Sequence, residues 1–495
     1  MSTDTQTPGA RPATHLETLL GLASGLEPFS SDHGQAYIGL PSGESPQFWP
    51  VRSARFRDWL LAVFHNTRGE LPSDSALRRA ISAIESLAHA NTSFRRSVER
   101  RVAANGNPRL PECISLDLDN QGSNAIEITA EGWAAGDGLR HGFRHAFRHS
   151  RGNLALPVPL HDCAPSALGR LFRVAPGPNL TLLQAWLAAA LRPTGPYPIL
   201  VLTGPPGSGK SVAAAMLRNL VDPSTAPLQA LPASPAALLR EAWHNWLLAF
   251  DDVHRISDSM SSALCRLSSG TGYLLNERAA EREALRLKLT RPIVVTTTEP
   301  AAKLVRNPEN NPFLSRVITV HMEAIPPTER KTEEALWARF ESLHPALLGL
   351  LCDATSMAMR NYSSVKLPGL PRHADFTVWA AAAAPAFGYS VNTLVNALVA
   401  PTLDPIRGAL HHFLAGRPSW SGTATALWNY LESELGKHRI PASPRGLSQL
   451  LNKLGGVHIE RYRVAGGLTR LMTVTLTLAL ATQPARRFDI ARIAA

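Results

Sequence analysis

The sequence predicts an α/β protein built around a parallel β-sheet, with a further domain before that sheet and another after it. From about residue 176 to 322, apolar segments of strand length alternate with segments of helical pattern, which is typical of parallel strands joined by crossover helices. Within this stretch a glycine-rich loop stands directly between one strand and the helix that follows it. The chain has 495 residues, enough for about two to four domains with separate cores.

Four regions are expected along the chain. Short strand-like runs (AYIGL, CISLDL, AIEIT) mix with two helical stretches near the N-terminus, and one of these helices is expected to run from Ser73 towards Ala90. The predicted regions are an N-terminal α+β domain (1–175), the core with the parallel sheet (176–322), a helical lid or linker (323–416) and a C-terminal domain (417–480).

Composition indicates a soluble globular protein. Hydrophobic residues make up 44% of the chain and charged residues 18%, and no apolar run approaches the roughly 18 residues that a membrane helix needs. The first dozen residues lack the basic start and apolar stretch of a secretory signal. The four cysteines lie far apart, which argues against a disulfide framework or a zinc ribbon. We therefore expect a cytoplasmic protein without a membrane partner.

The net charge of +11 is concentrated at one end. Residues 401–495 hold 12 Lys and Arg against 5 Asp and Glu, a surplus of +7 in less than a fifth of the chain. Such a surplus suits a polyanion partner, most simply DNA, because fixed cations release counterions from phosphates. A solvated basic surface is the alternative.

The glycine-rich loop reads GPPGSGKS and follows the apolar segment PILVLT, the context that marks a phosphate-binding loop, or P-loop. Its glycines let the backbone turn N–H groups onto phosphates, while Lys210 is expected to reach the β and γ phosphates of ATP and Ser211 to ligate Mg²⁺. The loop residues expected to bind the nucleotide are Gly204, Pro205, Pro206, Gly207, Ser208, Gly209, Lys210 and Ser211.

A second strand, in WLLAFDDVH, delivers two carboxylates to its C-terminal end, where ligands bind in open α/β sheets. We expect Asp251 to hold Mg²⁺ and Asp252 to orient the attacking water in catalysis. The alternative for Asp252 is that it caps the helix after the strand.

Two further residues complete the predicted site. The strand RPIVVTTTEP, expected to lie between the other two strands, ends in threonines, of which Thr297 is assigned as the sensor of the γ-phosphate. Ordinary threonines at a strand end are the competing interpretation. Arg316 ends a short helix before the next apolar strand, where its guanidinium could stabilise the transferring phosphoryl group in a neighbouring subunit. A surface arginine in a salt bridge is the alternative.

The C-terminal domain is predicted to be a winged helix. Two helices, GTATALWNYLESEL and SPRGLSQLLNKLGG with Ser443 as N-cap, precede a hairpin formed by HIERYRV and LTRLMTVTL. In a helix-turn-helix the second helix meets DNA, and the hairpin could touch its backbone. The expected nucleic-acid contacts are Arg445, Ser448, Gln449, Lys453, Arg461, Arg463 and Arg470. A domain that docks protein instead of DNA is the alternative.

With these residues placed, the chain resembles the primase-helicase type ATPases of phages and integrated mobile elements, related to superfamily-three helicases within the AAA+ group. The resemblance covers roughly residues 170–480. Its segments are GPPGSGKS, AFDDVH, SDSMSSALCRLSSGTGY, RPIVVTTTEP, FLSRVITVHMEAIPPTERKTEEALW, LPRHADFTVWAAAA and the segment from Trp420. Two features depart from the pattern: the sensor is Thr where Asn is usual, and residues 1–175 show no acidic metal triad for primase chemistry.

The resemblance implies an ATP-hydrolysing, DNA-dependent helicase or replication-initiation ATPase of a phage or mobile element. It also implies ATP and Mg²⁺ as cofactors and a homo-oligomeric ring, such as a hexamer, in which Arg316 acts in trans. The alternative function is an ATP-switched regulatory or defence scaffold whose winged helix binds protein.

Overall fold

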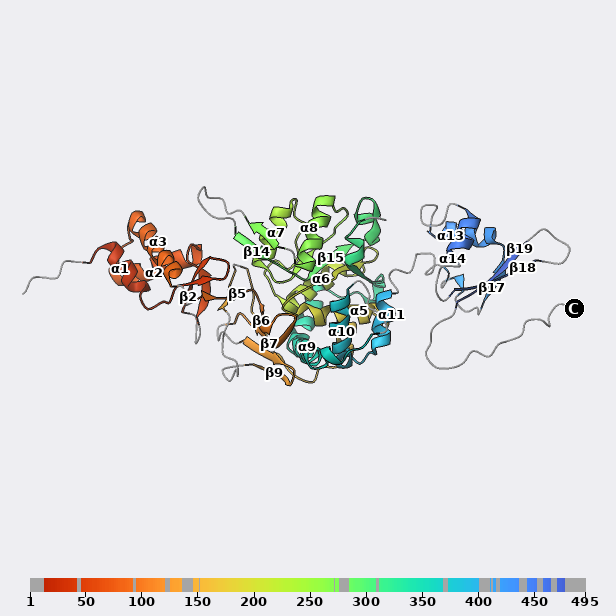
Figure 1. The fold of residues 1–495 in the computed structure, drawn as a ribbon, viewed down its shortest axis with the longest axis horizontal. Helices are drawn as coiled ribbons and strands as arrows, with labels where there is room; N and C mark the ends of the chain where they lie inside the picture. Colours follow the sequence, from red (N-terminus) through yellow and green to blue (C-terminus); the bar gives the residue numbers. More distant parts are fainter. Residues whose placement is uncertain are drawn as a thin grey trace, which may run out of the picture. The chain divides into compact units, whose positions relative to one another are not determined.

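Figure 1 shows the computed structural model of the chain. It forms two compact units, Met1–Leu398 and Val399–Ala495, and each is described by itself. The four regions expected from the sequence divide the chain more finely and remain an expectation. The structure describes residues 13–41, 46–91, 95–120, 125–135, 146–150, 152–270, 272–275, 285–308, 311–367, 373–399, 410, 413–414, 419–435, 443–451, 457–463 and 470–476.

The first unit begins with an α+β region in which three helices pack against a sheet of order β3-β2-β1-β4. Each helix begins at a side-chain cap: Thr14 forms a capping box with Glu17, and Ser53 and Ser73 each accept from the backbone N–H three residues on. The elements are α1 (His15–Ala23), β1 (Phe29–Ser31), β2 (Ala36–Leu40), β3 (Gln47–Pro50), α2 (Ala54–Arg68), α3 (Asp74–Ala90) and β4 (Arg95–Arg96).

An antiparallel meander of order β6-β7-β8-β9 follows, beside a short parallel pair of β5 and β10. Its buried side chains, among them Ile114, Ile126 and Ile128, join the main core of the unit. The runs CISLDL and AIEIT thus lie in strands, as the sequence predicts. The elements are β5 (Val98–Glu99), β6 (Val102–Asn107), β7 (Leu110–Asp117), β8 (Ala125–Thr129), β9 (Gly132–Ala135) and β10 (Ala146–Phe147).

The central sheet is parallel, with strand order β12-β15-β11-β16. Strand β15 therefore lies between β11, which leads into the glycine-rich loop, and β12, which is followed by Asp251; this confirms the expected order of the three strands. A separate antiparallel hairpin of β13 and β14 precedes β15. The strands are β11 (Ile199–Thr203), β12 (Leu248–Phe250), β13 (Gly272–Leu275), β14 (Leu285–Lys288), β15 (Ile293–Thr297) and β16 (Val317–His321).

Helices cover both faces of this sheet, which explains why its strands are apolar along their length. In β11, Ile199 and Val201 belong to the core that includes α7 and α8, whereas Leu200 and Leu202 belong to the core that includes α5 and α6. Alternate side chains of a strand point to opposite faces, so one strand supplies both layers. The helices are α4 (Ser166–Phe172), α5 (Pro178–Ala190), α6 (Lys210–Val221), α7 (Pro235–His244) and α8 (Asp258–Ser269).

Three more helices complete the first unit: α9 (Glu333–Asn361), α10 (Ala374–Phe387) and α11 (Val391–Val399). In Figure 1, α9 and α10 lie on the side of the sheet opposite α8. Helix α10 is apolar on every side, as suits a buried helix, and its Trp379 donates to the carbonyl of Ala188 in α5. Among the described helices, none has both the length and the apolarity needed to cross a membrane.

The described part of the second unit includes a three-stranded antiparallel sheet of order β17-β19-β18 and the helices α13 and α14. Ser443 caps α14 by accepting from the Gly446 N–H at 3.2 Å, and β18 and β19 pair as a hairpin, both as expected. The small core contains Leu427, Leu431 and Leu447. The elements are β17 (Trp420–Gly422), α13 (Ala424–Leu435), α14 (Pro444–Leu451), β18 (Val457–Arg463) and β19 (Arg470–Leu476).

Candidate functional site

The glycine-rich loop links the C-terminal end of β11 to the first residue of α6. Gly204, Gly207 and Gly209 all have positive φ angles, of 158°, 78° and 80°. A Cβ atom on Gly204 would lie 2.1 Å from the carbonyl oxygen of Met322, so only glycine fits there. The loop therefore packs against the residue that follows β16, and Gly209 is the N-cap residue of α6.

Lys210 folds back into this loop. Its ammonium group donates to the carbonyl oxygens of Gly204 and Pro205 at 2.9 Å and to the Ser208 hydroxyl at 3.3 Å. The residue is only 8% exposed, and burial lowers the pKa of Lys210, an effect that the carboxylates of Asp251 and Asp252 partly oppose. Because β15 pairs in parallel with both β11 and β12, the loop and the end of β12 lie at the same end of the sheet.

Asp251 is held by a threonine of the neighbouring strand. The Thr296 hydroxyl donates to Asp251 Oδ1 at 2.5 Å and accepts from the Asp252 backbone N–H at 2.9 Å. Thr296 is 1% exposed, and its single O–H donor is used in holding the carboxylate. The other carboxylate oxygen, Oδ2, has no hydrogen-bond partner among the described residues.

Asp252 points outward from the same turn. Its φ angle is 52°, in the left-handed region, and its side chain is 68% exposed and lies 3.2 Å from His254 Nε2. The cap of the following helix α8 is Ser257, whose hydroxyl accepts from the Met260 N–H. The capping alternative for Asp252 is therefore wrong, and its carboxylate is available at the rim of the site.

Thr297 occupies a different position from Thr296, because adjacent strand residues face opposite sides. It is buried, pairs in register with Thr203, and its hydroxyl accepts from the Glu299 N–H at 3.1 Å. The Thr203 hydroxyl also reaches this turn, donating to the Glu299 carbonyl at 3.3 Å. Thr297 thus lies beside the strand that leads into the loop. The contact with Asp251 comes from Thr296, a residue to which the sequence pattern gave no role.

Arg316 lies at the other edge of the sheet. It ends the 3-10 turn η4 (Leu314–Arg316) and immediately precedes β16. Because β16 runs parallel to β11, the start of β16 lies at the end of the sheet away from the loop. Its Nη1 donates to the Pro312 carbonyl at 3.1 Å, and the structure gives it no ion pair with any described residue. The guanidinium therefore lies away from the loop of its own chain.

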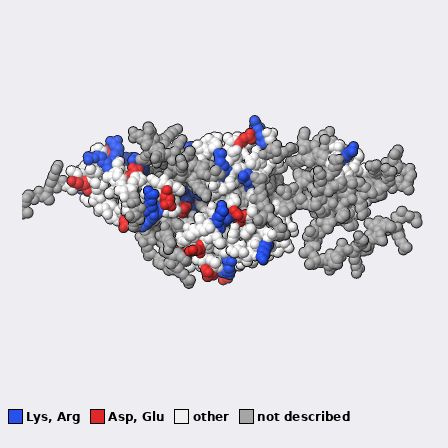
Figure 2. All heavy atoms as spheres, in the orientation of Figure 1, with Lys and Arg blue, Asp and Glu red and all other residues white. Residues whose placement is uncertain are grey.

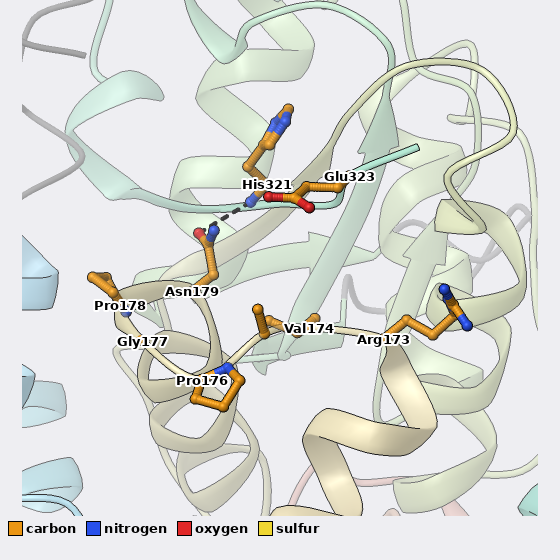
Figure 3. A pocket seen from close by; sticks show the side chains of 9 residues that line it. Arg173, Val174, Pro176, Gly177, Pro178, Asn179, His321 and Glu323 are labelled. Carbon is orange, nitrogen blue, oxygen red and sulfur yellow. Dashed lines mark hydrogen bonds between the residues drawn. The ribbon is translucent and has the colours of Figure 1, made fainter. Parts of the chain in front are cut away.

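A pocket opens beside the loop, between the N-terminus of α5 and the end of β16 (Figure 3). Figure 3 shows His321 and Glu323 on one side and the stretch from Val174 to Pro178 on the other, joined by the hydrogen bond from the His321 N–H to Asn179 Oδ1 at 3.2 Å. Since Met322, between His321 and Glu323, is in contact with Gly204, pocket and loop are neighbours. The sequence contains no signal for this pocket.

A buried ion network anchors the far ends of α6 and β12. Asp222, which follows α6, is completely buried and accepts from the N–H groups of Trp246 and Leu247 at 2.7 and 3.1 Å. Burial alone would raise the pKa of Asp222, but the surrounding arginines hold it well below its usual range. Its ionic partners are Arg100, Arg101 and Arg218. This network ties the N-terminal part of the unit to the two elements that carry the site.

The residues expected to contact nucleic acid lie in the second unit. Arg445 is exposed on the first turn of α14, and Ser448 is half-buried one turn further on. Arg463 and Arg470 are paired in the register of the hairpin. For Gln449, Arg461, Arg463 and Arg470 the structure describes the backbone, and Lys453 lies outside the described residues. In the first unit, Lys and Arg lie beside Asp and Glu on the face drawn in Figure 2.

Comparison with known proteins gives two findings. Residues 166–404, just under half of the chain, match the family model of the actinomycete integrative conjugative element replication protein, so this region is similar to a replication protein of a mobile element. An apo structure of the NrS-1 C-terminal region aligns at 10% identity over 93% of this chain and 98% of that one, with a TM-score of 0.39. An A-form apo structure of the same region aligns at 10% identity over 94% and 100%, with a TM-score of 0.38. No curated protein matches the chain.

Proposed function

We propose that this protein is an ATP-hydrolysing, DNA-dependent helicase or replication-initiation ATPase of a mobile element. The observation that carries the proposal is that the glycine-rich loop with Lys210 and the carboxylate of Asp251 lie at the carboxyl ends of β11 and β12, two strands that both pair with β15 in one parallel sheet. The similarity of residues 166–404 to a replication protein supplies the biological setting.

The residues present fit a nucleotide with Mg²⁺. Lys210 is held by two carbonyl oxygens and a hydroxyl, acceptors that phosphate oxygens can replace with a gain in charge pairing. Asp251 keeps Oδ2 available while Thr296 fixes Oδ1, and Ser211 is exposed on the first turn of α6. These two oxygens would hold Mg²⁺, which when bound neutralises charge on the phosphates.

The remaining roles follow from position. Asp252, exposed in the turn after β12, would accept a proton from the attacking water, and Thr297 would sense the terminal phosphate through the end of β15. The pocket between α5 and β16 offers a place for the nucleoside. Arg316 lies at the opposite edge of the sheet, so it would serve a neighbouring copy, which favours a homo-oligomeric ring.

DNA binding is assigned to the second unit, where the surplus of positive charge coincides with the α13–α14 pair and the β18–β19 hairpin. We propose that this unit is a winged helix and that its expected contacts, above all Arg445 on the first turn of α14, bind DNA.

The test is the rate of ATP hydrolysis by purified protein and by Lys210→Ala, with exposed Lys366→Ala as the matched control. Loss of one group that stabilises the transition state typically lowers kcat by about 100-fold or more. We expect that loss for Lys210→Ala and none for Lys366→Ala. Full activity in a folded Lys210→Ala variant would overturn the site assignment.

A further inference from the structure

The chain segment that follows β16 runs along the glycine-rich loop. The Met322 N–H donates to the Thr203 carbonyl at 2.8 Å, and the Ile325 N–H donates to the Gly207 carbonyl at 3.4 Å. Ile325 Cδ1 lies 3.4 Å from the position that a Cβ atom on Gly209 would take. The segment therefore covers the loop over several residues, although more than 100 residues separate the two in sequence.

Arg330, at the end of this segment, brings a cation to the loop. Its Nη2 atom lies 3.8 Å from the position of a Cβ atom on Gly207, and its Nε donates to the Ile325 carbonyl at 3.3 Å, which holds the guanidinium in place. The residue is exposed to solvent. Its charge thus lies beside the loop and is open to solvent.

The guanidinium of Arg330 is not neutralised by a described acidic group. Its neighbour Glu329 pairs with Arg173, with Nη2 and Oε2 2.5 Å apart, and within the part of the chain that the structure describes no ion pair involves Arg330. Arg173 in turn borders the pocket beside the loop. The pair of Arg173 and Glu329 therefore holds the turn that precedes Arg330 beside the pocket. Because Glu329 is paired with Arg173, the charge of Arg330 is left for a ligand.

We infer that Arg330 binds the terminal phosphates of the nucleotide held by its own chain and makes the site prefer a triphosphate to a diphosphate. This inference rests on the proposed function. A nucleoside triphosphate carries more negative charge than its diphosphate, and a guanidinium pairs with phosphate oxygens through two parallel N–H donors. Lys210 lies inside the loop, and Arg316 lies at the opposite end of the sheet. Among the described residues, Arg330 therefore supplies a second cation against the loop, in addition to Lys210.

The experiment compares Arg330→Ala with Arg330→Lys and with Lys331→Ala, an exposed neighbour of equal charge. The dissociation constants of Mg-ADP and of a non-hydrolysable Mg-ATP analogue are measured by calorimetry, and the melting temperature is measured without nucleotide. Arg330→Ala should weaken binding of the analogue about 10- to 100-fold, as expected for a lost charge-assisted hydrogen bond, and binding of ADP about three-fold or less. Arg330→Lys should recover part of the loss, and Lys331→Ala should match the unaltered protein.

Other outcomes overturn the inference. Equal weakening of both nucleotides, together with a lower melting temperature, would show that Arg330 only supports the folded segment. Unchanged binding of the analogue by Arg330→Ala would show that Arg330 does not contact the phosphates. In that case, normal nucleotide binding by the unaltered chain would still leave the proposed function standing. If the unaltered protein binds neither nucleotide, the proposed function fails and the inference fails with it.

Discussion

Replacing Asp222 by Asn tests how firmly the far ends of α6 and β12 are joined. The Asp222 carboxylate is completely buried among three arginines and accepts from the N–H groups of Trp246 and Leu247. Asparagine keeps the shape but removes the charge, so three buried guanidinium groups lose their anion. Because Asp251 directly follows β12 and α6 begins at Lys210, loosening this anchor should also slow the proposed ATP hydrolysis.

Removing one partner of a buried ion pair costs about 3–5 kcal/mol, and we expect Asp222→Asn to lower the free energy of unfolding of the first unit by that amount. The control is Glu85→Gln, which weakens the pair of Glu85 with Arg52, whose side chains are 17% and 51% exposed; it should cost less, because solvent screens this pair. Urea unfolding followed by tryptophan fluorescence measures both. A loss for Asp222→Asn no larger than that for Glu85→Gln would refute the reasoning.

The pH dependence of this anchor has a definite sign. The pKa of Asp222 is lower in the folded chain than in the unfolded one, where it is about 3.9. The stabilisation is therefore present above about pH 4 and is lost as the pH falls through the folded value.

Four further predictions can be tested on the same protein. Asp252→Asn should bind ATP but hydrolyse it at least about 100-fold more slowly in a turnover assay, since its proposed role is in the chemical step; normal turnover would remove it from the mechanism. Arg316→Ala should be inactive alone yet supply a working site when mixed with Lys210→Ala, and mixtures without activity would contradict a role in trans. Burial lowers the pKa of His344 to about 4, so the free energy of unfolding should fall by about 3 kcal/mol from pH 6.5 to pH 4. His344→Leu should abolish that dependence in urea unfolding. A variant with the same pH profile as the unaltered protein would contradict this. A quadruple variant changes Arg445, Lys453, Arg461 and Arg463 to Ala. It should bind DNA more weakly and lower the slope of log K against log salt by about 0.9 per lost phosphate contact, whereas unchanged binding at every salt concentration would indicate a protein-docking domain.

Local patterns predicted much of the first unit and part of the second. The apolar run before the glycines forms β11, the helix after them begins at Lys210, and β15 lies between β11 and β12 as expected. Ser73 and Ser443 cap the helices that follow them. These features depend on contacts among residues close in sequence or on the topology of a parallel sheet, so sequence patterns carry them.

The contacts that complete the site were not predictable in this way. Thr296 and Thr297 have the same chemistry, and only the register of β15 against β12 decides which of them meets Asp251. Arg330 reaches the loop because the chain returns over it after β16, and Arg100 meets Asp222 across 122 positions of sequence. No periodicity in a single sequence records such long-range approaches.

The central claim is that ATP hydrolysis by this chain is coupled to DNA, and the most direct measurement is its ATPase rate with no DNA, with single-stranded DNA and with duplex DNA. Lys210→Ala gives the background rate. Our account predicts a rate that rises when DNA is added to the full chain, with the rise lost in the quadruple variant while its basal rate is kept. A rate well above background that is the same with and without either form of DNA, over a range of salt concentrations, would contradict the account and favour an ATP-switched scaffold whose second unit binds protein.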